Sequence, residues 1–236
     1  MPQLLKKYDE TLIETIKRYN EIAPHYSRDE RGKLDNDQIF HLKKFINFVG
    51  SPPRKILDAG CGTGKDILYL SSYGYELFGI DLSSGMLEEA LKVVYNKNNI
   101  HLLREDFRYM SFSNFVFDGI WCSASLVHLP YKDKQIALQE FNRVLKKGEI
   151  LSIGIQNLLC IDRLIRIFKS YIRRPIYSLT KTFLYKMELG YAYYDKRHWF
   201  FPTKPSLIRL VEDAGFEIIE SNNVFSKRLR IYAIKK

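Results

Sequence analysis

The sequence predicts an α/β fold in which helices cover a doubly wound, mostly parallel sheet of seven strands. From Lys55 onward, short apolar runs alternate with amphipathic helical stretches. A cluster of glycines follows the first of these runs, as expected where a strand turns sharply into a helix. The alternation stops after Ile155 and returns at Lys204. Strands separated by helices of this length form βαβ units, so the sheet is expected to be parallel with right-handed crossovers.

The N-terminal residues predict two helices before the sheet. Apolar side chains recur at helical spacing in 9–20 and again in 36–49. Gly50 and the pair Pro52–Pro53 end the second helix, because neither residue type continues one readily. The strands are then expected at 55–59, 75–80, 100–103, 115–122, 149–155, 216–221 and 229–234, and the later helices at 65–73, 84–95, 134–145 and 204–214.

The composition is that of a globular protein in a reducing compartment. Apolar residues make up 46% and charged residues 27% of the 236 residues. No stretch approaches the roughly 20 apolar residues of a membrane span, and the first residues lack the apolar core of a signal peptide. Cys61, Cys122 and Cys160 are odd in number and widely spaced, which argues against a disulfide framework or a zinc pattern. We therefore expect a cytoplasmic protein, and no metal, since no cluster of His and carboxylates stands out.

The glycine-rich turn predicts a nucleoside site. The run from Asp58 to Gly64 reads Asp-Ala-Gly-Cys-Gly-Thr-Gly, and Asp81 ends the following strand. Its G-x-G-x-G spacing fits the dinucleotide fingerprint G-x-G-x-x-G poorly. A carboxylate at the end of the second strand can accept hydrogen bonds from both ribose hydroxyls. The alternative is a turn that only packs a helix on a sheet, but the two acids beside the glycines favour the nucleoside site.

These motifs resemble the core of class I S-adenosylmethionine (SAM)-dependent methyltransferases, especially the small-molecule group. The resemblance covers 55–155 and implies a Rossmann-like fold whose last strand, at 229–234, is antiparallel. It also implies that SAM is the cofactor and S-adenosylhomocysteine (SAH) the product. Four motifs carry it, in order: 58–64, 79–86, 105–107 and 117–123.

The resemblance also implies which residues bind each part of the cofactor. The first motif would hold the methionine part through its backbone, and the end of the fourth would lie beside it. Asp81 would bind ribose, Leu82 and Met86 would pack on adenine, and Asp106 would accept from the adenine amino group near the backbone of Phe107. The implied cofactor-binding residues are Asp58, Ala59, Gly60, Cys61, Gly62, Gly64, Asp81, Leu82, Met86, Asp106, Phe107, Cys122 and Ser123.

Two residues are candidates for the acceptor side of the reaction. Tyr26 lies in a segment that resembles the N-terminal part of these enzymes that closes over the cofactor; the alternative is a tyrosine packed under its own helix. His128 follows the fourth strand, where catalytic groups of parallel sheets gather, and as a neutral imidazole it could act as a general base. The alternative is a structural histidine bonded to the backbone.

The segment before the returning helix carries much of the positive charge. Residues 157–198 contain nine Lys or Arg and three acids, a difference of +6 in a chain with net charge +10. Most of this charge fits a solvated helical cap. A sharper hypothesis is a substrate cap in which Arg197 and His198 meet an anionic acceptor. A third is peripheral contact of 160–187 with an anionic membrane that presents a lipid-like acceptor. Nucleic acid is a weaker partner, because no RNA-binding module or zinc finger accompanies the charge.

The sequence thus predicts one domain, 1–236, that moves a methyl group from SAM to an oxygen or nitrogen of a small molecule. Its parts would be an N-terminal helical lid (1–53), a SAM-binding core (54–155), a basic and aromatic cap (156–200) and the C-terminal part of the sheet (201–236). Two alternatives remain open: a methyltransferase acting on tRNA or rRNA, and a SAM-binding regulator without turnover.

Overall fold

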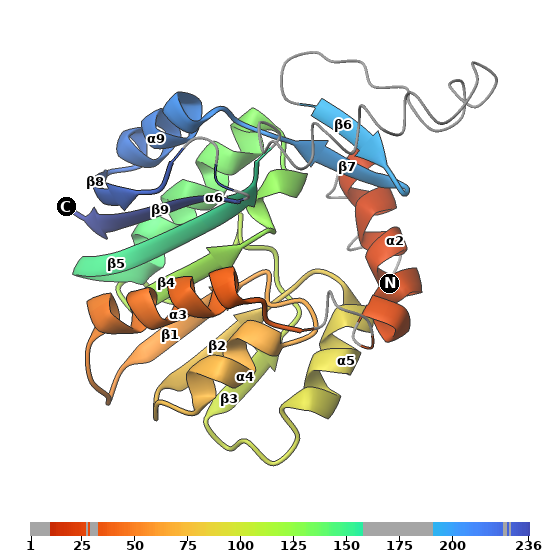
Figure 1. Cartoon of the computed structure of the whole chain (residues 1–236), viewed down its shortest axis with the longest axis horizontal. Helices are drawn as coiled ribbons and strands as arrows, with labels where there is room; N and C mark the ends of the chain where they lie inside the picture. The colour runs from red at the N-terminus through yellow and green to blue at the C-terminus, as the bar shows by residue number, and fades with distance from the viewer. Residues whose placement is uncertain (1–9, 27, 29–32, 158–190, 224–225, 227) are drawn as a thin grey trace.

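A seven-stranded sheet organises the chain, which confirms the predicted α/β class (Figure 1). The computed structural model describes residues 10–26, 28, 33–157, 191–223, 226 and 228–236. The first five strands are parallel to one another, whereas the last is antiparallel to both of its neighbours, as the resemblance implied. Across the sheet the order is β3 (Ile100–Leu103), β2 (Glu76–Ile80), β1 (Lys55–Ala59), β4 (Phe117–Ser123), β5 (Leu145–Gln156), β9 (Arg228–Lys235) and β8 (Phe216–Ser221).

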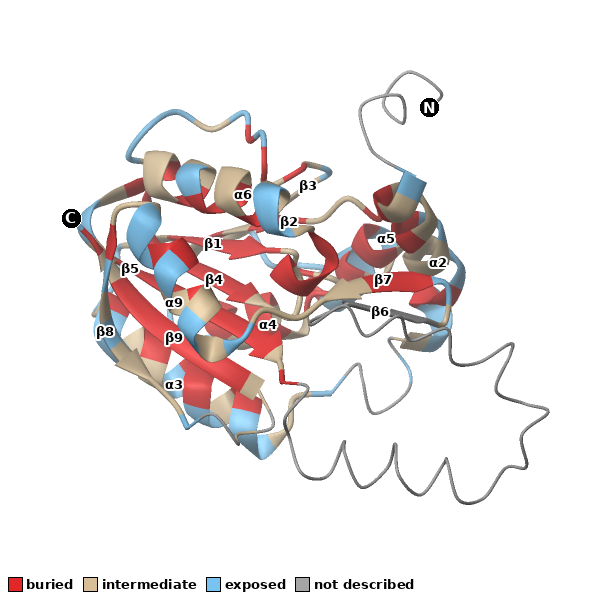
Figure 2. Ribbon diagram, turned by 90° about the horizontal axis from the view of Figure 1, so that it is seen from above, coloured by how far each residue is buried: buried red, intermediate tan, exposed pale blue. Residues whose placement is uncertain are grey.

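Helices bury both faces of this sheet. On one face, α3 (Asn36–Val49) and α4 (Lys65–Ser71) contribute Leu42, Phe45 and Leu70 to an apolar cluster. On the other, α6 (Tyr131–Val144) and α9 (Lys204–Asp213) pack through residues such as Phe141 and Leu210. Figure 2 shows the buried strands between α6 on one side and α3 on the other. The carboxyl ends of the parallel strands are left for the site.

Short polar side chains set the starts of several helices. Asp35 accepts from Gln38 N at 2.8 Å before α3, and Thr203 accepts from Ser206 N before α9. Such caps satisfy backbone donors that have no partner inside the helix. The predicted 36–49 helix is confirmed with both ends unchanged, but α2 (Glu10–Tyr26) continues past its predicted end at residue 20, since Ile22 and Ala23 extend its buried face.

The end of the predicted helical cap is a β hairpin. Residues 191–200 form β6 (Tyr191–Tyr194) and β7 (Arg197–Phe200), paired antiparallel. Asp195 and Lys196 join them with φ of 54° and 55°, the left-handed conformation that two-residue hairpin turns require. Aromatic residues on both strands favour a strand over a helix. Residues 158–190, with Cys160 and the predicted membrane contact at 160–187, lie outside the described residues.

Polar contacts attach α2 to this hairpin, at the end of the molecule far from the C-terminus (Figure 1). Arg18 donates to Asp195 at 2.6 Å and 3.0 Å. His198 makes two polar contacts with α2. Its ring Nε2 lies 3.0 Å from Glu14 Oε2, and its backbone N donates to Thr15 Oγ1 at 3.1 Å. Hydrogen bonds therefore hold the N-terminal helix and the hairpin together at this end of the molecule.

A buried lysine ties the hairpin to the core. The Lys134 ammonium donates to the carbonyl oxygens of Leu129 and Phe200, and burial lowers its pKa from 10.5 to about 7, partly opposed by Asp133. Between these two pKa values the unfolded chain binds more protons than the folded protein, so stability rises with pH across that window.

We expect the Lys134→Met variant to lose this rise of stability with pH. Urea unfolding near pH 7 and near pH 9.5 checks it; equal pH dependence in both proteins would contradict the expectation.

Candidate functional site

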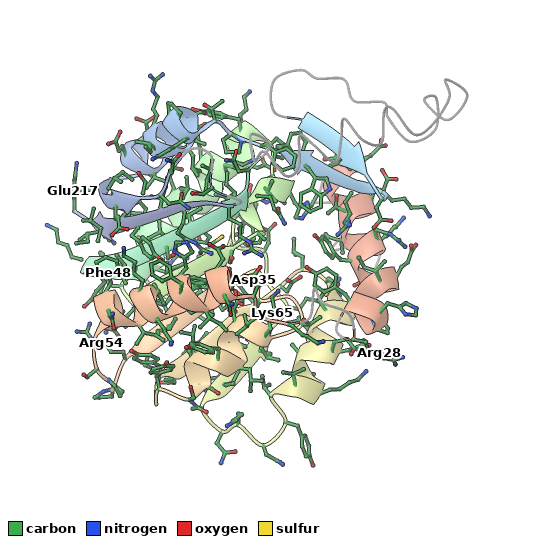
Figure 3. The ribbon with its side chains drawn as sticks, viewed as in Figure 1. Arg28, Asp35, Phe48, Arg54, Lys65 and Glu217 are labelled. Carbon is green, nitrogen blue, oxygen red and sulfur yellow. The ribbon has the colours of Figure 1, made fainter. Side chains whose placement is uncertain are left out.

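The candidate site lies at the carboxyl ends of β1 and β4, where the strand order reverses. In open α/β sheets, ligands bind in the crevice at this switch point. The loop after β1 runs from Gly60 to Gly64, and the loop after β4 leads into a short 3-10 helix, η2 (Leu126–His128). In Figure 3 the labelled Asp35 and Lys65 lie at this edge of the sheet, where α3 and α4 begin.

The glycine loop needs its glycines for two different reasons. Gly60, Gly62 and Gly64 have φ of 81°, 54° and 81°, a region that other residues enter at a cost. A Cβ on Gly60 would lie 2.3 Å from the Ser125 Cβ, whereas a Cβ on Gly62 would meet nothing within 4 Å. The loop is therefore closed against the β4–η2 connection at Gly60 and open at Gly62, where a ligand can approach its backbone.

The Asp81 carboxylate closes onto this loop from β2. Its Oδ2 accepts from Gly62 N at 3.0 Å and its Oδ1 accepts from Ser83 N at 2.8 Å. Burial raises the pKa of Asp81, and the backbone donors of Ser83 and Gly62 oppose that rise. Two charge-assisted bonds thus orient the carboxylate predicted to bind ribose.

Two further buried carboxylates lie beside the loop and are incompletely paired. No described residue bonds Asp58 Oδ2 or Asp66 Oδ1. Burial, then the charges of Asp66 and Asp81, raise the pKa of Asp58 well above its usual value. A buried acceptor without a donor is costly, and a cationic ligand relieves that cost. These residues fit SAM, which carries a sulfonium and an ammonium, and no metal is needed to explain them.

The second predicted motif is covered by α2. Asn20 Oδ1 accepts from Ser83 Oγ at 2.7 Å and from Gly85 N at 3.0 Å, where α5 (Ser84–Val93) begins. Met86 is buried against Ile22 and Ala23 of α2. Leu82 is half-buried and packs toward the larger core cluster. Asn20 thus fastens α2 to the predicted cofactor residues, a role that its polar side chain did not reveal in the sequence.

The predicted adenine contact, Asp106, is already held by an arginine. Arg108 donates to it from its backbone N at 2.9 Å and from Nε and Nη2 at 2.8–3.1 Å, and also pairs with Asp133. Phe107 is half-buried, with its ring 5.8 Å from that of Phe141. The structure thus directs the Asp106 carboxylate to Arg108, and its contact with adenine stays a prediction.

The fourth motif connects the two loops. Ser125 Oγ donates to Ala59 O at 2.8 Å and lies 3.2 Å from the Cys122 Sγ. Ser123 Oγ accepts from Gln38 Nε2 at 3.0 Å and from Arg230 Nη2 at 3.2 Å. Both Cys61 and Cys122 are buried free thiols. The carboxyl end of β4 is therefore fixed from β1, α3 and β9 together.

The predicted base, His128, is bonded at both ring nitrogens. Its Nδ1 lies 2.8 Å from the carbonyl oxygen of His198, and its Nε2 lies 2.8 Å from the Tyr19 hydroxyl. Because a carbonyl only accepts, Nδ1 carries the proton and Nε2 accepts from Tyr19. Both ring nitrogens of His128 are therefore occupied, and the Tyr19 hydroxyl, from the predicted helix at 9–20, covers its Nε2.

Strand β7 directs its predicted acceptor residues in two directions. The buried Arg197 guanidinium lies 5.1 Å from the Tyr19 ring centre and 5.2 Å from that of Trp199, while His198 turns to α2. Alternation along a strand explains the division. Arg197 Nη2 donates to Asp195, but no described residue accepts from Arg197 Nε or Trp199 Nε1. We call Tyr19, His128, Arg197 and Trp199 the acceptor wall.

Tyr26, the predicted lid residue, is a neighbour of this wall rather than part of it. Its ring meets that of Tyr19 edge to face at 6.4 Å, and it is half-buried at the end of α2. The wall brings together residues from α2, η2 and β7, which are far apart in the chain, and the sequence pattern could not show this. The sequence singled out His128 and Arg197 separately, but nothing in it placed them together.

Within the described ranges, no three His, Cys, Asp or Glu side chains gather as a metal site. No described helix is both long and apolar enough to cross a bilayer.

Comparisons with known proteins point to one kind of enzyme. A family model described as a methyltransferase domain matches residues 56–148. The demethylmenaquinone methyltransferase of Staphylococcus haemolyticus is 31% identical over 185 residues, which are 76% of this chain and 74% of the relative.

Solved structures share the fold at lower identity. The PH0226 protein of Pyrococcus horikoshii has a TM-score of 0.72 and 20% identity, covering 92% of this chain and 98% of its own. A Burkholderia thailandensis 1,6-didemethyltoxoflavin-N1-methyltransferase, solved with that compound and SAH bound, has a TM-score of 0.69 and 16% identity, covering 97% and 91%.

Proposed function

Because the chain belongs to the family of SAM-dependent methyltransferases, we propose that it methylates an oxygen or nitrogen atom of a small acceptor, bound at the acceptor wall, that is anionic when it reacts. The observation that carries this proposal is the pair of buried donors on one face of β7, Arg197 Nε and Trp199 Nε1, for which the described residues hold no acceptor. Buried donors are nearly always bonded, so they favour a ligand rich in oxygen.

The charge of the wall favours an anion. Arg197 is 6% exposed and stacks between two aromatic rings, and its pairing with Asp195 uses one edge of the guanidinium. Asp195 is shared with Arg18, so its charge is divided between two cations. The relative from S. haemolyticus is named for demethylmenaquinone, which supports a small-molecule acceptor of lipid-like character.

The protein's part in the reaction is to position two partners and exclude water. SAM supplies an electrophilic methyl group. The loop from Gly60 to Gly64, with Asp58 and Asp81, holds the donor, while the acceptor wall holds the nucleophile. Fixing two reactants in a near-attack arrangement removes much of the entropic barrier of methyl transfer. The α2 helix covers both positions and keeps water out.

Replacing Asp81 with asparagine tests the cofactor half of this proposal. An amide places an NH₂ against one of the two backbone donors that now meet a carboxylate oxygen, so the Gly62 loop loses its support. We expect the affinity for SAH, measured by calorimetry, to fall about thirtyfold, equivalent to about 2 kcal/mol. Glu88→Gln, a change on α5 away from these contacts, is the control and should bind SAH like the wild type. Undiminished binding by Asp81→Asn would refute this assignment.

Labelled methyl transfer tests the acceptor half. Purified protein is incubated with SAM carrying a tritiated methyl group and, separately, with the small-molecule fraction and the RNA fraction of a cell extract. We expect label in the small-molecule fraction, reduced by Arg197→Gln. Label in RNA would replace the proposal with the nucleic-acid alternative, and SAH binding without any transfer would favour a non-catalytic regulator.

A further inference from the structure

The contact between Tyr19 and His128 has the geometry of a proton relay. The Tyr19 hydroxyl lies 2.8 Å from His128 Nε2, and His128 Nδ1–H donates to the His198 carbonyl, which fixes the ring. The Nε2 lone pair therefore already accepts a hydrogen bond from the Tyr19 hydroxyl. The oxygen of Tyr19 also interacts with the Arg197 side chain, and a hydroxyl oxygen has a second lone pair that can accept one further hydrogen bond. When this oxygen receives a proton from a ligand, the hydroxyl proton of Tyr19 can move to His128 Nε2.

The groups around the pair keep it neutral at rest. Burial, together with Arg197 from β7, Lys134 from α6 and His198, lowers the pKa of His128 to about 3. Burial also raises the pKa of Tyr19, while the charge of Arg197 opposes that rise. These nearby cations disfavour an imidazolium unless an anion appears beside them. An acceptor that loses its proton supplies that anion at the same moment.

We propose that Tyr19 takes the proton of an acidic acceptor hydroxyl while its own hydroxyl proton passes to His128 Nε2, so that the acceptor is a phenol or an enol. The inference rests on the proposed function. The acceptor O–H bond breaks and its electron pair stays on oxygen, which becomes the nucleophile. Tyr19 ends as it began, and His128 becomes an imidazolium. The proton leaves to solvent when product departs, and Arg197 Nε donates to the oxyanion meanwhile.

The wall also selects the acceptor class by shape. The rings of Tyr19 and Trp199 flank the guanidinium of Arg197, and the Trp199 and His128 rings lie 4.3 Å apart. Flat aromatic or conjugated molecules pack well against such rings. Their hydroxyl groups are also more acidic than those of aliphatic alcohols, so they give up a proton to the Tyr19–His128 pair more readily. Tyr19 is thus the residue that touches the acceptor, and His128 acts through it.

A coloured phenol tests the relay without methyl transfer. Protein saturated with SAH is mixed with 4-nitrophenol at a pH where the free probe is mainly the colourless phenol. We expect the bound probe to show the yellow phenolate absorption. In protein labelled with ¹⁵N at its histidine rings, His128 should change from the neutral Nδ1–H form to the doubly protonated form as the probe binds. The His128→Gln variant assigns its resonances.

Variants separate the relay from general effects on folding. Tyr19→Phe keeps the ring against Arg197 and removes the hydroxyl; we expect it to bind the probe with about tenfold less phenolate, and His128 to stay neutral. His128→Gln keeps an acceptor for Tyr19 and a donor for the His198 carbonyl but cannot hold the proton, so it should also leave the probe protonated. Tyr131→Phe, at an exposed tyrosine that starts α6, should behave like the wild type.

The outcomes distinguish this inference from the proposed function. If SAH itself does not bind, the proposed function fails. If SAH binds but the probe is not bound, or is bound as the neutral phenol, the relay alone is overturned. Phenolate formation that is equal in wild type, Tyr19→Phe and His128→Gln also overturns it. Ionisation in the wild type, lost in both variants while SAH affinity is kept, supports it.

Discussion

Replacing Arg230 with alanine is expected to lower the free energy of unfolding by about 3–5 kcal/mol. This arginine is 0% exposed in β9, and its guanidinium lies 4.2 Å from the centre of the Trp121 ring. It donates to Gln38 Oε1 and Ser123 Oγ, both at 3.2 Å, and no described residue accepts from its Nε. Alanine leaves a cavity and removes a donor from the buried Gln38 Oε1 and from the half-buried Ser123 Oγ.

The partner strand explains where the volume of Arg230 fits. Gly154 of β5 pairs with Arg230, and a Cβ on Gly154 would lie 2.4 Å from the Arg230 Cζ. Gly154→Ala alone should therefore destabilise the protein. In the double variant the added methyl group enters the space that the arginine leaves, so the combined cost should be clearly less than the sum. Urea denaturation of the four proteins measures this cycle. Strict additivity would show that the two residues do not share this space.

Gly60→Ala should abolish measurable SAH binding and cost at least about 3 kcal/mol of stability. Gly60 combines a φ of 81° with a Cβ position that would overlap Ser125, which also bonds the Ala59 carbonyl. The added methyl group must displace the β4–η2 connection, and with it the backbone beside the predicted methionine position. Calorimetry with SAH and urea unfolding measure the two effects.

Gly148 is a matched control for Gly60. Its φ is 78°, but a Cβ added there would meet nothing within 4 Å. Gly148→Ala therefore isolates the backbone strain, about 1 kcal/mol, and should leave SAH affinity unchanged. Adding Ser125→Gly to Gly60→Ala removes the overlapping atom and should recover part of the binding. An equal effect of alanine at Gly60 and Gly148 would show that Ser125 does not limit the loop.

Local patterns sufficed to predict the sheet and the position of the glycine-rich turn. The strands 55–59, 100–103 and 216–221 have the predicted bounds, because each is a short apolar run between turn residues. The position of Asp81 could also be predicted, because it ends the strand that follows the glycine-rich turn at 58–64. These features are contiguous in the chain, so their hydrophobic periodicity and their flanking turn residues are visible in the sequence.

Features built from distant residues could not be predicted. Tyr19 and His128 are 109 positions apart, and nothing in either neighbourhood indicates that their side chains bond. Arg230 lies in a strand that was predicted, yet its burial depends on the missing side chain of Gly154 across the sheet. The hairpin of 191–200 was missed because residues 156–200 were predicted as one helical cap, although the aromatic residues of 191–200 favour strands and Asp195–Lys196 forms their turn.

Adjacent residues of one helix contact the two halves of the proposed site. Asn20 holds the start of α5 beside the predicted ribose residues, while Tyr19 bonds His128 on the acceptor side. Since Tyr19 and Asn20 are neighbours on one helix, a displacement of α2 as a whole would disturb both contacts, whereas removal of one side chain need not. We therefore expect that a cofactor bound at the proposed donor half orders the proposed acceptor half, and thermodynamic reciprocity then requires that the acceptor tighten the cofactor by the same factor. The expected result is that the two ligands bind synergistically rather than independently.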